Sequence, residues 1–163
     1  MKKITIMFLC IALALVFTAG YSQAVDLGGK KAIGFNGNLL GGRYWIDNLI
    51  GIDGGIGFST GGGSTAFSLG AGLPYVIKST KNLNFELKPS IMFGITSPTA
   101  PATSVTAFEI SALGVVEYFI PGLEEISFNA GVGLNLNINS AATTTTVFSI
   151  TSSVPFFGLY YYF

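Results

Sequence analysis

The segment ISFNAGVGLNLNIN, residues 126–139, alternates strictly between apolar side chains and polar or small ones. Successive side chains of a β-strand point to opposite faces, so a period of two gives the strand one apolar face and one polar or small face. The segment therefore predicts one long strand. Its apolar face would carry Ile126, Phe128, Ala130, Val132, Leu134, Leu136 and Ile138.

The same alternation recurs at 49–58, 67–77, 83–95 and 108–120. Each segment spans about 10 to 14 residues, whereas strands of soluble proteins average about five or six. The second face is mainly glycine, serine and asparagine, which suits a crowded interior better than solvent. A soluble barrel would turn the apolar face inward, and an outer-membrane barrel would turn it outward to lipid. Strand length and the small second face favour the membrane barrel.

The first 24 residues predict a secretory signal peptide. Lys2 and Lys3 precede an apolar run from Ile4 to Phe17, and Ser22-Gln23-Ala24 offers small residues for cleavage. The run is shorter than the roughly 20 residues that a spanning helix needs. We therefore expect a signal peptide at 1–24 and one barrel domain at 25–163.

The composition of the expected mature chain restricts its chemistry. Only 10% of all residues are charged, against about 25% in soluble domains. Loss of Lys2 and Lys3 leaves six of the eight basic residues against all eight acidic ones, which gives no basic surface for nucleic acid. The single cysteine, Cys10, lies in the signal peptide, so no disulfide or thiol chemistry is expected.

Alternating short and long connections give the strand count. Short ones are expected at 47–48, 80–82 and 121–125, and longer Gly/Ser/Thr/Pro/Ala-rich ones at 59–65, 96–106 and 139–146. Outer-membrane barrels have short periplasmic turns and longer outer loops. With two further strands near 30–36 and 39–46, the sequence predicts an all-β, eight-stranded, antiparallel, up-and-down transmembrane β-barrel with both termini in the periplasm.

The chain given ends on the aromatic stretch VPFFGLYYYF, residues 154–163. Alternating apolar residues that end on an aromatic are typical of the signal that outer-membrane barrels present to their assembly machinery. A last strand paired with the first would remove the open sheet edge. Tyr44, Trp45, Tyr118 and Tyr161 are expected to form an aromatic girdle at the periplasmic interface. The expected insertion signal is Phe157, Leu159, Tyr161 and Phe163.

Charged residues gather on the face that would line the lumen. Arg43 is expected to reach Asp53 on the neighbouring strand, and Glu86 and Lys88 stand two apart, roughly 7 Å along one strand, so direct or shared pairing is expected. A salt-bridge network that fills the lumen is the favoured interpretation, and an ion path is the alternative. The full set is Arg43, Asp53, Glu86, Lys88, Glu109 and Glu117.

The sequence favours no enzyme, cofactor or metal site. A chain without histidine cannot build a Ser-His or Cys-His arrangement. Glu109 and Glu117 would lie about 27 Å apart along one strand. The glycines at 61–63 lack the following Lys-Ser/Thr of a phosphate loop and are expected in an outer loop. The pair Glu124 and Glu125 is expected in a solvated turn.

The segments GGRYWIDNLIGIDGGIGFS (41–59) and GVVEYFIPGLEEISFNAGVGL (114–134) resemble strand–turn–strand units of small Gram-negative outer-membrane barrels of the OmpA, OmpX and opacity-protein type, in an uncharacterised subgroup. The resemblance covers 25–163 and implies a cell-envelope protein. Its partners would be outer-membrane lipid, lipopolysaccharide and the barrel assembly machinery.

A non-enzymatic structural or surface barrel is the first functional hypothesis. The alternatives are a narrow, porin-like or OmpW-like conduit lined by Phe156, Tyr160 and Tyr162, and an adhesin that acts through 96–106 and 139–146. A secreted, soluble lipid-binding barrel is the rival at the level of the fold.

Overall fold

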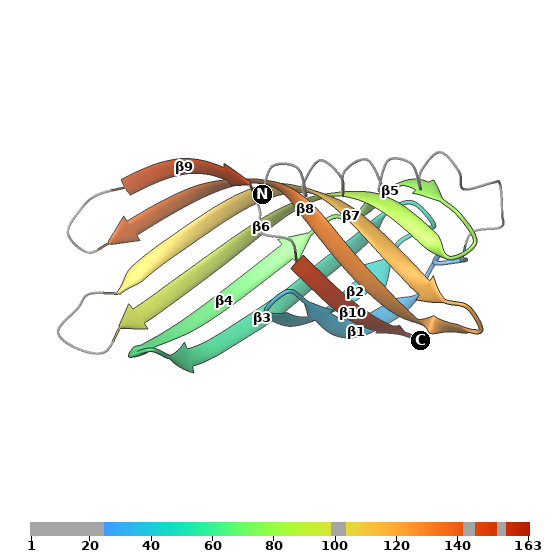
Figure 1. The fold of residues 1–163 in the computed structure, drawn as a ribbon, viewed down its shortest axis with the longest axis horizontal. Helices are drawn as coiled ribbons and strands as arrows, with labels where there is room; N and C mark the ends of the chain where they lie inside the picture. Colours follow the sequence, from blue (N-terminus) through green and yellow to red (C-terminus); the bar gives the residue numbers. More distant parts are fainter. Residues whose placement is uncertain (1–24, 99–103, 142–145, 153–155) are drawn as a thin grey trace, which may run out of the picture.

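The computed structural model describes residues 25–98, 104–141, 146–152 and 156–163, with the backbone alone at 141 and 146–152; the expected signal peptide lies outside these ranges. The described chain forms one antiparallel sheet that closes on itself (Figure 1). Its strands are β1 (Lys31–Asn36), β2 (Leu39–Trp45), β3 (Gly51–Gly61), β4 (Ser64–Gly72), β5 (Tyr75–Ser79), β6 (Leu83–Pro98), β7 (Val105–Ile120), β8 (Leu123–Ala141), β9 (Thr146–Ser152) and β10 (Phe156–Tyr162).

These ten segments make eight strands of an up-and-down barrel, as the sequence predicts. β4 and β5 pair with successive parts of β6, and β9 and β10 pair with successive parts of β8, so each pair acts as one interrupted strand. The first interruption falls at Leu73-Pro74, because proline has no N–H to donate to the ladder. β10 closes the barrel against β1, with Phe35 opposite Leu159.

The predicted faces are also found. Outward positions of the described strands carry large apolar side chains, of which Ile56 is 54% exposed and Leu134 61% exposed. The intervening positions point into the barrel and are mostly buried; on β7 these include Ser111, Val115 and Glu117. The alternation of the sequence is therefore the inside–outside pattern of the barrel wall.

The connections differ from the expectation at one end of the barrel. The predicted loop at 59–65 is a two-residue turn, Gly62-Gly63, because β3 and β4 stay paired as far as Gly61 and Ser64. Both turn glycines have positive φ, 57° and 76°, as tight hairpin turns require. β6 continues through Pro98 and β8 through Ala141, so much of the predicted loop sequence at 96–106 and 139–146 is strand. Of the rest, 99–103 and 142–145 lie outside the described residues.

The two ends of the barrel differ in outline. The terminal end contains Lys31, Phe163 and the turns near 46–50, 80–82 and 121–122. At the opposite loop end, β3, β4, β6, β7, β8 and β9 reach far beyond β1, β2 and β10, which stop near the middle of the long axis (Figure 1). The barrel wall is thus shortest at the β1–β2 turn. No helix in the described ranges has the length and apolarity of a membrane-crossing helix.

Candidate functional site: the barrel interior

All six charged residues expected in the lumen belong to inward-facing positions. Five of them are buried, and Glu109, nearer the loop end, is half-buried. The buried five come from β2, β3, β6 and β7 and meet across the interior. We refer to Arg43, Asp53, Glu86, Lys88 and Glu117 as the charge network.

Arg43 is the centre of the charge network. Its Nη2 donates to Asp53 Oδ2 at 3.1 Å, and its Nη1 donates to Glu117 Oε2 at 3.2 Å. Nη1 also lies 3.6 Å from Glu86 Oε1. The guanidinium stacks over the ring of Tyr160, 4.6 Å from its centroid. One arginine from β2 therefore contacts acidic residues on three other strands, β3, β6 and β7, and so links distant parts of the barrel wall.

Glu86 and Lys88, which stand two residues apart on one face of β6, are linked indirectly, by ion pairs that run through Arg43 and Asp53. Lys88 Nζ donates to Asp53 Oδ2 at 3.1 Å, and Asp53 also accepts from Arg43. The pairing is thus shared, with Glu86 on one side of Arg43 and Lys88 on the far side of Asp53. Gly72 makes room for this contact, since a Cβ there would lie 2.5 Å from Asp53 Oδ1.

Glu117 is held by the hydroxyl groups of Ser127 and Tyr162, a contact that the sequence does not predict. Ser127 Oγ donates to Glu117 Oε1 at 2.6 Å, and the Tyr162 hydroxyl donates to the same oxygen at 2.9 Å. Both donors occupy inward positions of β8 and β10. Strand parity could place them in the lumen, but their meeting at one oxygen depends on how the strands are staggered around the barrel.

The charge network contains more acid than base. Three carboxylates, of Asp53, Glu86 and Glu117, face two cations, Arg43 and Lys88. Among the described residues, the one ion pair of Glu86 is the 3.6 Å contact of its Oε1 with Arg43 Nη1. Buried charges are costly unless they are paired. The stability of the charge network therefore depends most on Arg43, because this cation is shared by all three acids.

An aromatic plug fills the interior between the charge network and the terminal end. It consists of Trp45, Phe119, Tyr160 and Tyr162, none more than 2% exposed. Trp45 Nε1 donates to the Tyr162 hydroxyl at 3.2 Å, and the rings of Phe119 and Tyr162 lie 5.7 Å apart. The expected girdle position of Trp45 is therefore wrong, because Trp45 stands two residues after Arg43 and shares its inward face.

The residues before β1 close the terminal end below this plug. Val25 and Leu27 are buried in the same hydrophobic cluster as Trp45. The backbone nitrogens of Leu27 and Gly28 both donate to Asn48 Oδ1, at 2.7 and 2.8 Å. The segment is thus fixed to the β2–β3 turn, and the barrel is packed from this turn up to the charge network.

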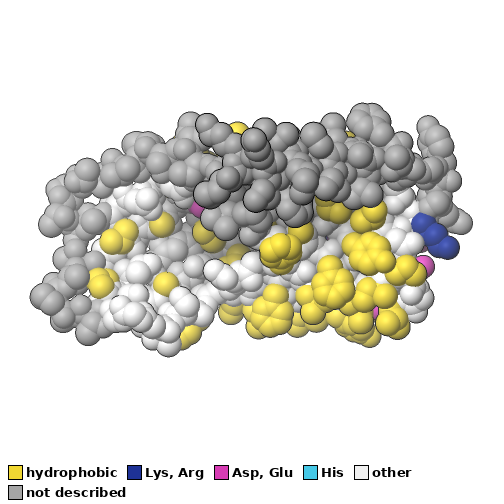
Figure 2. All heavy atoms as spheres, in the orientation of Figure 1, with side chains coloured by type: hydrophobic (Ala, Val, Ile, Leu, Met, Phe, Trp, Pro, Cys, Tyr) yellow, Lys and Arg dark blue, Asp and Glu magenta, His cyan; other side chains and the backbone are white. Residues whose placement is uncertain are grey.

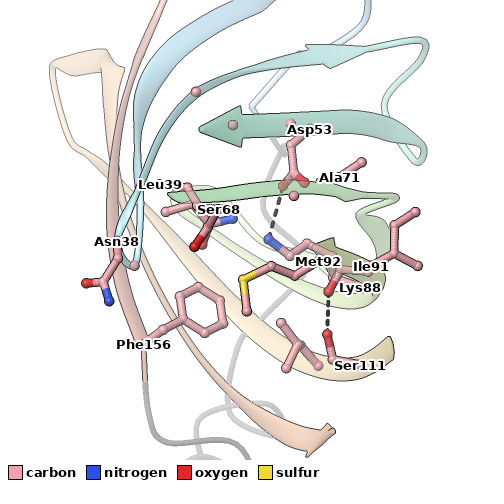
Figure 3. A pocket seen from close by; sticks show the side chains of 18 of the residues that line it. Asn38, Leu39, Asp53, Ser68, Ala71, Lys88, Ile91, Met92, Ser111 and Phe156 are labelled. Carbon is pink, nitrogen blue, oxygen red and sulfur yellow. Dashed lines mark hydrogen bonds and ion pairs between the residues drawn. The ribbon is translucent and has the colours of Figure 1, made fainter. Parts of the chain in front are cut away.

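Toward the loop end the interior contains a cavity of about 400 Å³. Asp53 and Lys88 lie at its floor, and small residues of β3 and β4, such as Gly55 and Gly70, line one side. Leu39, Ser68, Met92 and Phe156 point into it from different strands (Figure 3). We refer to this space as the interior cavity. Phe156 and Tyr160 line it as the conduit hypothesis expects, and Tyr160 also belongs to the plug, whereas Tyr162 lies in the plug alone.

The residues proposed as an insertion signal lie on the outer face of the last strand and just after it. Exposed fractions are 73% for Phe157, 41% for Leu159, 54% for Tyr161 and 68% for Phe163. Tyr44 and Tyr118, expected in the girdle, are also exposed.

The acidic pair expected in a solvated turn lies outside the barrel interior. Glu124 and Glu125 are exposed next to the β7–β8 turn. Among the described residues, no three His, Cys, Asp or Glu side chains are arranged to hold a metal ion.

Comparison of the chain with protein-family models, curated proteins and solved structures gives no match. The barrel itself is therefore the basis for inferring a function.

Proposed function

We propose that this chain is an integral outer-membrane β-barrel with a structural or surface role and a closed interior. One observation carries the proposal: the distribution of side chains is inverted relative to a soluble barrel. Charged residues are buried in the interior, while large apolar residues stand exposed on the outer wall. In water such a wall would be a very large apolar patch, whereas in lipid it is the expected outer surface of a barrel.

The apolar surface has the form of a band. In the view of Figure 2, apolar side chains gather over the half of the molecule that contains β1, β2 and β10, and few charged side chains interrupt them. Beyond this half, outward positions become polar: on β3, Ile56 and Phe58 are followed by Thr60. A band that ends in Ser/Thr-rich strand ends supports a barrel that crosses lipid and extends past it on one side.

The packing of the interior favours a closed barrel over a channel. The charge network and the aromatic plug occupy the section between the interior cavity and the terminal end. Eight strands enclose a space that side chains can fill. The salt bridges would therefore hold the wall together, and the polar strand ends would form the surface that other molecules meet.

A matched pair of substitutions on β3 tests the lipid-facing role. Ile56→Arg places a charge within the apolar band, and Thr60→Arg places the same charge on the same face beyond it. Arginine near the middle of a bilayer costs about 2–4 kcal/mol and little near its edge. Urea titration of the barrel folded in lipid vesicles should show this loss for Ile56→Arg and less than about 1 kcal/mol for Thr60→Arg.

The soluble rival makes the opposite prediction. A barrel that works in water would be recovered from the periplasm without detergent, and Ile56→Arg would leave it as stable as Thr60→Arg or improve its solubility. Fractionation of a Gram-negative host that expresses the full chain decides this separately, since the proposal requires the protein in the outer-membrane pellet.

A further inference from the structure

The interior cavity has the size of a small-molecule site, and its apolar side is already formed. Ligand sites in proteins range from about 300 to 1,000 Å³, and this one measures about 400 Å³. Leu39, Met92 and Phe156 bring apolar groups into it from β2, β6 and β10 (Figure 3). Ser68 on β4 is small, and Gly70 leaves room for Leu39, since a Cβ there would lie 2.7 Å from Leu39 Cδ1.

The charges that line the cavity are unequally matched. Lys88, at the floor, is neutralised by Asp53 at 3.1 Å. Glu109 of β7 stands in the wall, and none of the ion pairs found among the described residues includes it. A half-buried carboxylate that has no cation beside it favours a positively charged ligand in the cavity.

Asn135 of β8 lies beside Glu109 and adds an acceptor oxygen that has no hydrogen-bond partner among the described residues. Its side-chain amide hydrogen-bonds to Glu109. The unpartnered acceptor is the buried Oδ1. The nearby hydroxyls of Ser90 and Ser111 bond to each other at 2.6 Å. This part of the wall therefore presents acceptor oxygens and calls for a donor, preferably a charged one.

The interior cavity reaches the β1–β2 turn, where the barrel wall is shortest. Asn36, Gly37 and Asn38 form the β1–β2 turn and line the cavity. β3 pairs with β2 only as far as Ile56, opposite Leu40, and beyond that point it pairs with β4 on its other side only. A small molecule can therefore reach Glu109 from the loop end without passing the charge network.

We propose that the interior cavity binds a small organic cation. Its ammonium or guanidinium group donates to the Glu109 carboxylate and to Asn135 Oδ1, and its apolar part packs against Met92 and Phe156. A single carboxylate is a poor site for a bare metal ion, which needs several oxygen ligands, whereas one carboxylate and one amide oxygen suit an alkylammonium group. This site is a property of the barrel interior and goes beyond the structural role proposed above.

Three probes of equal length test the charge requirement: butylammonium, 1-butanol and butanoate. Each is titrated into the ¹⁵N-labelled mature barrel, folded in a non-ionic detergent, and followed by NMR shifts. Butylammonium should bind at least about tenfold more tightly than butanol, because a hydrogen bond to a charged group is the stronger kind. Butanoate should bind most weakly, and the shifts should centre on residues near Glu109 and Asn135. Equal affinity for the three probes, or no binding, overturns the proposal.

A conservative variant tests the residue. Glu109→Gln keeps the shape of the side chain and removes its charge, so butylammonium should lose its advantage over butanol. Glu124→Gln removes a charge from the exposed turn at the terminal end and should keep the advantage. A heat-shift gel confirms folding of both variants. An unchanged preference in folded Glu109→Gln contradicts the assignment, and if that variant does not fold, the comparison of the three probes on the unmodified barrel decides.

Discussion

The two halves of the barrel interior are built from the same alternating pattern and differ in what the inward positions contain. Near the terminal end those positions carry Trp45, Phe119, Tyr160 and Tyr162, and the space is full. Near the loop end they carry glycine and serine, with Met92 among them, and about 400 Å³ stays open. Strand pattern therefore sets which side chains point inward, and side-chain volume sets whether the interior is a plug or a site.

The charge network marks the boundary between the halves and depends most on one residue. Arg43→Met removes the cation that Asp53, Glu86 and Glu117 share. Loss of one partner from a buried ion pair costs about 3–5 kcal/mol, since a charge is left unmatched. Urea titration in lipid vesicles should show this loss of stability.

Lys31→Met is the control, because Lys31 is an exposed cation near the terminal end. It should change stability by no more than about 0.5 kcal/mol. Equal effects of the two substitutions would mean that Arg43 does not hold the two halves together.

A second pair of substitutions compares packing in the two halves directly. Phe119→Ala opens a void in a filled region and should lower stability by about 3 kcal/mol. Met92→Ala enlarges a cavity that is already open, so the same titration should show a loss of about 1 kcal/mol or less. A Met92→Ala variant as damaged as Phe119→Ala would indicate that the loop-end half is as tightly packed as the other.

The smallest expected effect is on conductance. The folded barrel should give no discrete current steps in a planar bilayer, because the plug and the charge network occupy the interior between the cavity and the terminal end. Regular steps that disappear in a Glu86→Gln variant would support the channel hypothesis and would extend the open half through the whole lumen. A heat-shift gel on the same sample ensures that silence reflects a folded protein.

Strand parity carried most of what the sequence could predict. It separated the outward apolar face from the inward charged face and gave the Arg43–Asp53 contact between neighbouring strands, which the structure shows at 3.1 Å. Trp45 differs from the girdle expectation, because its residue type and its position near a strand end suggest an interface residue, whereas its parity with Arg43 turns it inward. In a short, narrow barrel, an aromatic near the end packs inward as easily as it faces lipid.

Composition was a weaker guide at the loop end. Serine, threonine and glycine between 59 and 65 suggested a loop, but backbone pairing continues to Gly61 and Ser64. Such residues make strands when neighbours already supply a ladder. The contacts of Glu117 with Ser127 and Tyr162 also cannot be predicted from the sequence. They form between side chains of different strands, and whether these side chains meet depends on the stagger and curvature of the closed barrel.

The closing seam has a consequence for the order of assembly. β10 joins β1 through five residue pairs, whereas β7 joins β8 through sixteen. The seam also connects the two ends of the barrel domain, so it carries the largest loop-closure entropy of any strand pair, while the β7–β8 hairpin carries one of the smallest. The long hairpins should therefore form first, as a curved and still open sheet. The outward aromatics Phe157, Tyr161 and Phe163 would then remain available on a free edge until the last step of folding, when β1 arrives and covers it.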